Sequence, residues 1–373
     1  MLKVTEVDNI NKIIELKNVW NKLLSYYKNN NPFLTFEYLA TYWKHFGKDR
    51  KLKILCVKDE KNEIVAIAPL RLSNYTFAGL LTYKVIEPLS YMGADYTDFI
   101  LPNQDEKCLR KIISYLYEKN DWDFIYLYDI PETSTLSNLL RTLNNRTDPF
   151  IFDTLRGTVC PYISLPNSME AFTNRLNPNF RKNLKKRLKK LEKDFRKIEL
   201  KSYRDFGTVE EAMNIFFKLH QKRWTTKDMP GVFSTTETKR FYVEVAKRFA
   251  EKGWLALYFL TVNDEPIAAR YGFEYNNKMY FCLHGFNPDY SRYAPGHIMH
   301  LKVIENCIKK GIIECDFLKG GEPYKFYWTN TYRTNMGFRF VNKKKITSKI
   351  YDLGIKTAKK TKIDQVIGKL LQF

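Results

Sequence analysis

The sequence predicts an α/β protein made of two successive domains with the same plan. The chain has 373 residues, of which 44% are hydrophobic and 15% aromatic, which is enough for two buried cores. Each half is also expected to run through helices, a β-hairpin, and then a strand, a helix and a strand. A repeated order of elements indicates a duplicated unit. We therefore expect domains over residues 1–160 and 161–340, followed by a basic amphipathic tail over 341–373.

The first half begins with helices and continues with strands. Apolar residues at helical spacing predict its first helix. They are Ile13, Leu16, Trp20, Leu23 and Leu24. Thr35 can cap a second helix. Two β-rich runs around residues 59–62 predict a hairpin, and later β-rich runs at 83–90, 97–101 and 124–129, with a helix near 105–118, complete this half.

The second half repeats this order after a strongly basic helix. Capping boxes at residues 208–211 and 234–237 open two helices. Residues 254–286 then predict three strands joined by Asn- and Asp-rich turns. A helix over 298–309 and a strand over 312–318 complete the repeat.

The net charge of +21 is concentrated in two segments. Residues 175–204 contain 13 basic and 3 acidic residues, a net +10, and residues 339–373 contain 10 basic and 2 acidic residues, a net +8. In the first segment, Asn177 can cap a helix over 177–197, with Pro178 in its first turn. This helix has an apolar stripe and a lysine-rich face. It is either a solvated helix packed on one side or an arm for a polyanion, such as tRNA, an anionic polymer or a lipid headgroup surface.

The second basic segment is the tail, in which apolar residues at helical spacing alternate with lysines. Such a segment either docks on the body of its own protein or lies on a membrane surface. Both alternatives stay open from the sequence.

Several familiar classes of protein lack support in the sequence. No apolar run reaches the roughly 18 residues needed to cross a bilayer, and the first residues do not resemble a signal peptide, so we expect a cytoplasmic protein with membrane contact through the tail left open. The six cysteines have no metal-binding spacing and are expected to be buried thiols, so no metal is expected. Zinc-protease, serine-hydrolase, dinucleotide and NTP-binding motifs are absent.

Four segments of the second half resemble the GNAT superfamily, in the branch of CelD-like and FemAB-like cell-envelope proteins. They are FRKNLKKRLKKLEK at 180–193, LHQKRW at 219–224, GFNPDYSRYAPGHIM at 285–299 and CDFLKGGEPYKFYW at 315–328. The first-half segments NPFLTFEYLATYW and SYMGADYTDFIL also resemble such proteins. The resemblance implies two tandem GNAT-like domains, each a mixed, mostly antiparallel sheet flanked by helices. It also implies an acyltransferase that moves an acyl or aminoacyl group to an amine.

The loop before the helix at 298–309 is the expected binding site for the donor. A helix N-terminus offers unpaired N–H groups and the positive end of the helix dipole, which suits a pyrophosphate. The residues expected to form this cradle for acyl-CoA are Arg292, Tyr293, Ala294, Pro295, Gly296, His297 and Ile298. A proline and a histidine stand where the GNAT loop usually has glycine or alanine. The corresponding helix of the first half begins with Asp105 and Glu106, whose charges repel phosphate, so we expect that half to lack a cofactor loop and to shape the acceptor cleft.

Three residues are candidates for the chemistry of acyl transfer, which needs a base for the amine and a proton for the leaving thiolate. The family resemblance points to Glu322 as base and Tyr324 as acid, and His284 lies at the end of a strand where it can reach the acyl carbonyl. The expected substrate-binding residues are His220, Arg223, Trp224, Lys325 and Trp328. Structural roles for His220, Arg223, Trp224 and His284 are equally compatible with the sequence.

Three functions follow from these observations. The first is an N-acyltransferase that uses acyl-CoA and acts on an amino sugar or another cell-envelope or polysaccharide precursor. The second is a FemAB-like aminoacyltransferase that uses aminoacyl-tRNA, with the basic helix on the RNA backbone. The third is a non-catalytic binding protein on a decayed GNAT fold. The oligomeric state does not follow from the sequence.

Overall fold

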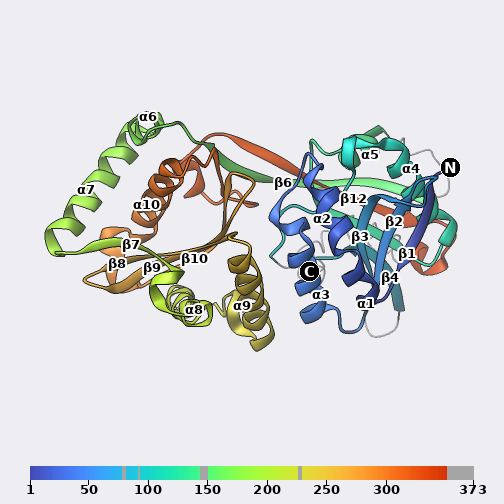
Figure 1. Ribbon diagram of the computed structural model, residues 1–373, viewed down its shortest axis with the longest axis horizontal. Helices are drawn as coiled ribbons and strands as arrows, with labels where there is room; N and C mark the ends of the chain where they lie inside the picture. The colour runs from blue at the N-terminus through green and yellow to red at the C-terminus, as the bar shows by residue number, and fades with distance from the viewer. Residues whose placement is uncertain (78–80, 91–92, 143–149, 226–228, 351–373) are drawn as a thin grey trace. The chain divides into compact units, whose positions relative to one another are not determined.

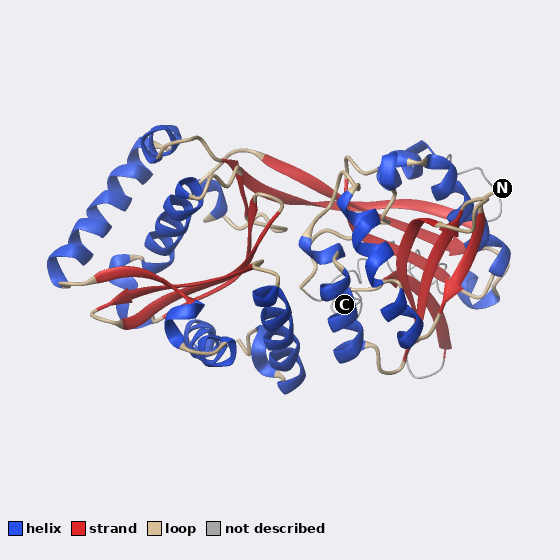
Figure 2. Cartoon of the chain, viewed as in Figure 1, coloured by secondary structure: helices blue, strands red, loops and turns tan. Residues whose placement is uncertain are grey.

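The chain forms two compact units, each with a mixed, mostly antiparallel sheet and flanking helices (Figures 1 and 2). The computed structural model describes residues 1–77, 81–90, 93–142, 150–225 and 229–350. The first unit comprises Met1–Asn30, Gly47–Gly157 and the chain from Asn335 onward. The second unit comprises Asn31–Phe46 and Thr158–Thr334. The expected fold class is confirmed.

The first unit contains the sheet β1-β2-β3-β4-β5-β12, in which only β4 and β5 are parallel among the described pairings. Its strands are β1 (Lys3–Val7), β2 (Arg50–Lys58), β3 (Ile64–Phe77), β4 (Leu81–Pro88), β5 (Phe124–Pro131) and β12 (Tyr332–Asn342). Its helices are α1 (Ile10–Glu15), α2 (Lys17–Ser25), α4 (Glu106–Lys119) and α5 (Thr135–Thr142). Helix α4 packs against β1, β2 and β3, and α2 packs against β3.

The second unit repeats this arrangement with the sheet β7-β8-β9-β10-β11-β6. Its strands are β6 (Phe150–Ser164), β7 (Ile198–Ser202), β8 (Leu255–Val262), β9 (Glu265–Tyr275), β10 (Lys278–Phe286) and β11 (Glu314–Asp316). Its helices are α3 (Phe36–Phe46), α6 (Met169–Arg175), α7 (Pro178–Asp194), α8 (Val209–Thr225), α9 (Thr236–Glu251) and α10 (Pro295–Lys309). Of the described pairings, β10 with β11 is the parallel one.

Helices cover both faces of the second sheet. Helices α7 and α10 lie on one face, and α8 and α9 lie on the other (Figure 1). Every residue of β8 is buried, as expected for a strand covered on both sides. The apolar side of α7 contributes Leu184 and Leu191 to the core that α10 shares with the sheet, while its lysine-rich side stays exposed.

The last strand of each sheet comes from a distant part of the chain. Strand β12 completes the first sheet beside β5 although it follows the whole second unit, and β6 pairs with β11 although it precedes that unit's other strands. The expected boundaries at residues 160 and 340 therefore fall inside strands that have residues in both units. Residues 31–46 also belong to the second unit, because α3 packs on α9.

Most local predictions are confirmed, and two need correction. Asn177 caps α7 through Asn179 N (2.9 Å), and Thr208 and Glu211 form the expected capping box. The cap of α9 is Thr235 rather than Ser234, since its hydroxyl accepts from the N–H of Thr238. The run at 97–101 makes a single bridge to β3 and no strand, and β6, β7, β12 and α5 lacked a prediction.

Other expectations concern absences and the tail. All six cysteines are free thiols, and all but Cys282 are buried, as expected. No helix in the described part of the chain is long and apolar enough to cross a membrane. Within the same residues, no cluster of histidine, cysteine or carboxylate side chains could hold a metal ion. The tail was predicted over residues 341–373, and the part of it from residue 351 onward lies outside the described residues.

Candidate active site

Helix α10 begins without a side-chain cap. Its N-cap residue, Ala294, has φ 54° and ψ 57°, and Pro295 has no N–H to satisfy. The N–H groups of His297 and Ile298 already donate to the Ala294 carbonyl, at 3.0 and 3.2 Å. Among the described residues, the N–H of Gly296 has no hydrogen-bond partner. One open donor therefore stands at the positive end of the helix dipole.

This open end lies in a cavity of about 290 Å³ in the second unit. The first turn of α10, from Ala294 to His297, forms one wall together with His300. Strand β10 contributes His284 and Phe286, α8 contributes Arg223, and Tyr324 closes the cavity. No carboxylate lines it in the part of the chain that the structure describes. Seven of the predicted site residues are thus brought together: Arg223, His284, Ala294, Pro295, Gly296, His297 and Tyr324.

The other residues of the predicted cradle lie outside this cavity. The Arg292 guanidinium is 63% exposed and lies 3.8 Å from a carboxylate oxygen of Asp194 in α7. The Tyr293 hydroxyl donates to the same oxygen of Asp194 at 2.6 Å. Ile298 is fully buried in the core. Arg292 and Tyr293 therefore connect the loop to α7, and the part of the loop that faces the cavity is Ala294–His297.

His284 is the histidine best placed for chemistry. It pairs with Arg270 across β9 and β10, and its ring lies 5.7 Å from the ring of Tyr324. Burial, followed by the charges of Arg270 and Arg223, holds the pKa of His284 well below its ordinary value. The imidazole is therefore neutral at pH 7, and its ring makes no hydrogen bond within the described residues. It can accept a proton from a ligand.

Two residues that the sequence analysis missed support the cavity from behind. The Nδ1–H of His300 donates to the Gly296 carbonyl at 2.8 Å, which leaves Nε2 as the acceptor for the Arg270 guanidinium. Arg270 also interacts electrostatically with Tyr324. The network therefore links the start of α10 to Tyr324. Its sequence signal was an arginine in the middle of the stretch IAARYGF of β9, whose other residues are apolar or aromatic.

Glu322 and Lys325, by contrast, do not line the cavity. Lys325 is 3% exposed, and its ammonium donates to the carbonyls of Leu318 (3.1 Å), Lys319 (2.7 Å) and Gly320 (3.2 Å). Glu322 is 55% exposed and forms an ion pair with Lys325 at 2.9 Å. Lys325 thus holds the loop that precedes Tyr324.

The predicted substrate-binding residues on α8 mostly make contacts with other residues of the protein. His220 is 1% exposed, and its Nε2 accepts from Trp224 Nε1 at 2.9 Å. Burial, followed by the charge of Arg223, lowers the pKa of His220 to about 4. Arg223 stacks on Trp224 at 5.3 Å and on Phe286 at 5.8 Å, and it is the member of this group that lines the cavity.

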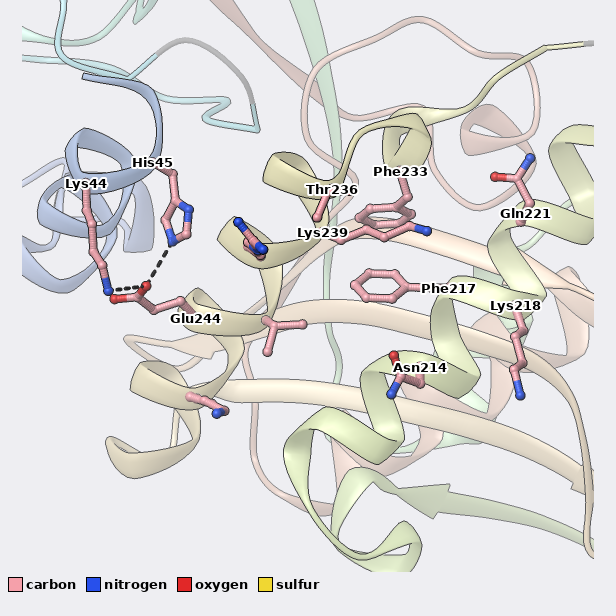
Figure 3. A pocket seen from close by; sticks show the side chains of 13 residues that line it. Lys44, His45, Asn214, Phe217, Lys218, Gln221, Phe233, Thr236, Lys239 and Glu244 are labelled. Carbon is pink, nitrogen blue, oxygen red and sulfur yellow. Dashed lines mark hydrogen bonds and ion pairs between the residues drawn. The ribbon is translucent and has the colours of Figure 1, made fainter. Parts of the chain in front are cut away.

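Two further cavities of the second unit have a different character. One, of about 600 Å³, lies between α7, the start of α10 and Trp328, and it shares Ala294 and His297 with the first cavity. The other, of about 990 Å³, lies between α3, α8 and α9 (Figure 3). In it Lys44 and His45 both contact Glu244 at 2.8 Å, while Lys218 and Lys239 make no ion pair among the described residues. None of the predicted site residues lines this cavity.

Comparison with known proteins identifies the second unit. A family model described as an acetyltransferase (GNAT) domain matches residues 178–326. The search of curated proteins gives no match to this chain.

Solved structures share the fold at low sequence identity. FemX has 11% identity and a TM-score of 0.60, and the match covers 94% of this chain and 99% of FemX. A conserved protein of unknown function from Bacteroides thetaiotaomicron has 12% identity and a TM-score of 0.54, with 92% of this chain and 100% of that chain covered. L-PGS from Bacillus licheniformis has 8% identity and a TM-score of 0.51, with coverages of 87% and 90%. Residues 178–326 therefore match a GNAT domain, and the chain shares the fold of FemX.

Proposed function

We propose that this protein is an N-acyltransferase of the GNAT superfamily that uses acyl-CoA and acylates an amine. We propose an amino sugar, or another precursor of the cell envelope or of a polysaccharide, as the acceptor. One observation carries the proposal: the uncapped start of α10 opens into the same cavity as His284 and Tyr324.

The start of α10 fits a phosphate group. The Gly296 N–H is an open donor, and a Cβ built on Gly296 has only Phe286 Cδ1 near it, at 3.9 Å. Residues 294–297 therefore leave room for a ligand atom close to the backbone. These residues would hold the diphosphate of acyl-CoA, which would supply an activated thioester when bound. The corresponding helix of the first unit, α4, is capped by its own Asp105, which supports a first unit without a donor site.

The side chains of the cavity suit the proton transfers of acyl transfer. The amine nitrogen forms a bond to the acyl carbon, and the carbon–sulfur bond breaks. Neutral His284 is placed to take the proton that the amine loses, and the Tyr324 hydroxyl to protonate the leaving thiolate. We assign the role of base to His284 rather than to Glu322, because Glu322 is engaged with Lys325. Lys325 then positions the loop, and Trp328 forms a wall of the adjoining cavity.

A thermal-shift panel with CoA, acetyl-CoA, longer acyl-CoAs and charged tRNA tests this function. We expect CoA to raise the melting temperature of the wild-type protein, since a ligand that binds the folded state stabilises it. Gly296→Asp should abolish the shift through charge repulsion and steric block. Gly296→Ala, which meets no close neighbour, is the matched control and should retain most of it. An unchanged shift in Gly296→Asp would place CoA elsewhere.

The aminoacyl-tRNA alternative is favoured by the exposed face of α7. Lys182, Lys185, Lys186 and Lys189 are exposed and make no ion pair within the described residues. Binding to tRNA that weakens steeply with salt, together with no response to CoA, would favour this donor. A response to neither ligand would favour a non-catalytic binding protein. Membrane contact through the tail and a cytoplasmic location remain part of the proposal.

A further inference from the structure

The cavity of about 990 Å³ between α3, α8 and α9 is separate from the proposed reaction site, because it shares no lining residue with the cavity at the start of α10. Residues three or four positions apart on α8 line it, and such residues share one side of a helix. They are Asn214, Phe217, Lys218 and Gln221. Helix α9 lines the opposite side with residues between positions 236 and 247. Together with the end of α3, these two helix faces form what we call the α8–α9 groove (Figure 3).

The floor of the α8–α9 groove is apolar and lies below the surface. The rings of Phe217 and Phe233 lie next to each other, with their centroids 4.5 Å apart (Figure 3). Phe217 is 8% exposed and Phe233 is 2% exposed, and the half-buried Val243 of α9 also lines the groove. An apolar side chain of a ligand reaches these rings only by entering the groove. Its burial there is favourable because it removes apolar surface from water.

Basic side chains outnumber acidic ones around this floor. Of the lining residues in the described chain, Glu244 is the one with a carboxylate. Lys44 and His45 both contact Glu244 at 2.8 Å, and Arg248 contacts it at 2.9 Å. The charge of Glu244 is therefore already balanced within the protein. The basic residues that line the groove are Lys44, Lys218, Lys239, Arg240 and Lys247.

Two of these cations have no acidic partner among the described residues. Arg240 and Lys247 each pair with a glutamate outside the lining. Lys218 on α8 and Lys239 on α9 are exposed, and neither forms an ion pair within the described part of the chain. They stand on the two helices that face each other across the groove. Their positive charge therefore attracts an anionic ligand to the apolar floor between them.

We propose that the α8–α9 groove docks an acidic segment of a partner protein. An aromatic or aliphatic side chain of that segment lies on Phe217 and Phe233, and its carboxylates pair with Lys218 and Lys239. The lining positions of α9 run from 236 to 247, about 16 Å at 1.5 Å per residue, which is the length of roughly five residues of extended chain. The inference goes beyond the proposed function and does not depend on it.

Other occupants match these features less well. The basic tail of the chain, with a net +8 over residues 339–373, is repelled by the lysines of the groove, and so is a second copy of a chain with a net charge of +21. A bilayer takes up apolar side chains that protrude, whereas Phe217 and Phe233 are recessed. Single-stranded nucleic acid stacks its bases on exposed ring faces, which these two side chains do not offer.

Fluorescence anisotropy with labelled synthetic peptides tests the proposal. One probe is a glutamate-rich peptide with a single central phenylalanine, and the other carries alanine in place of that phenylalanine. We expect the wild-type protein to bind the first peptide, and to bind the second about tenfold more weakly, because alanine buries less apolar surface on the floor of the groove. Loss of affinity at high salt is expected for both peptides, since exposed charges are screened.

Two variants change the groove without touching its buried floor. Lys218→Glu combined with Lys239→Glu reverses both unpaired charges, and Asn214→Trp fills the groove from an exposed position of α8. Each should raise the Kd of the phenylalanine peptide about tenfold or more. Lys182→Glu combined with Lys186→Glu makes the same change of net charge on the exposed face of α7. This matched control should leave the Kd within about twofold of the wild type.

The controls separate docking in the groove from attraction by net charge. Equal losses of affinity in the two double variants, or equal binding of the two peptides, would mean that charge alone holds the peptide and would overturn the proposal. Failure of the phenylalanine peptide to bind would overturn it as well. Vesicles of anionic lipid and single-stranded RNA are the remaining probes. Binding of either one that is lost in Lys218→Glu/Lys239→Glu, without binding of the peptide, would replace the acidic segment as the occupant.

Discussion

Gly285→Ala tests whether the contact between β10 and α8 positions the site. Gly285 lies between His284 and Phe286, and a Cβ built on it would stand 2.4 Å from His220 N, 2.6 Å from His220 Cα and 2.6 Å from Leu219 C. These are backbone atoms of α8, which cannot rotate away as a side chain can. To restore a normal contact, the helix must move by about 1 Å.

Such overpacking costs about 1–3 kcal/mol, and we expect the upper part of this range because the clash is with backbone. Urea denaturation should show the loss as a lower midpoint with an unchanged slope. Gly321→Ala is the matched control, since its Cβ would lie 3.5 Å from Val159 Cγ2, an ordinary contact. The displacement of α8 also moves Arg223, which lines the cavity, so CoA binding should weaken as well. If Gly285→Ala is as stable as Gly321→Ala, α8 does not pack closely against β10 at Gly285, and the position that we give to Arg223 in the cavity is wrong.

Three further predictions test the electrostatics, and Glu322→Gln is the control for the third. The pKa of His220 is lowered to about 4, so its contribution to the unfolding free energy is complete above pH 6.5 and is lost as the pH falls towards 4. Between pH 7 and pH 5, His220→Gln should therefore lose about 2 kcal/mol less unfolding free energy than the wild type in urea titrations. Burial raises the pKa of Asp98 from 3.8 to about 7, so the stability of the protein falls as the pH rises from 3.8 towards 7. Asp98→Asn removes this ionisation, so in thermal unfolding it should stabilise the protein more at pH 8 than at pH 5. Lys325→Met removes the ammonium donor from three carbonyls and should lower the unfolding free energy by about 1–3 kcal/mol, as measured by urea titration. Glu322→Gln, at its largely exposed partner, should change the unfolding free energy by no more than about 0.5 kcal/mol.

The parts predicted well from the sequence are those governed by local interactions. Asn177 caps α7 because its side chain reaches N–H groups two and three residues ahead, and such spacing is visible in any sequence. The segment before α10 was likewise recognisable, because proline and glycine mark a helix start with an open backbone. Four residues of the predicted cradle therefore do face the cavity.

The parts that were missed depend on distant pairing. The sequence order of the halves suggested that each domain closes with its own strands, but β12 and β6 complete sheets whose other strands lie far away in the chain. Their pairing partners are set by tertiary structure, which local propensity does not reveal. Arg270 and His300 were missed for the same reason, since their meeting depends on β9 packing against α10.

The segment CDFLKGGEPYKFYW shows why a motif does not assign roles to its members. Its three polar candidates, Glu322, Tyr324 and Lys325, are neighbours in sequence but differ in surroundings. The lysine is buried against the carbonyls of its own loop, and the glutamate is largely exposed and pairs with the lysine. Of the three, only the tyrosine lines the cavity. The lysine is thus used to hold the turn, and that turn presents the tyrosine to His284 and Arg270. Loss of function in a Lys325 variant would therefore report a displaced Tyr324, and a stability measurement on the same variant separates that effect from a direct part in the reaction.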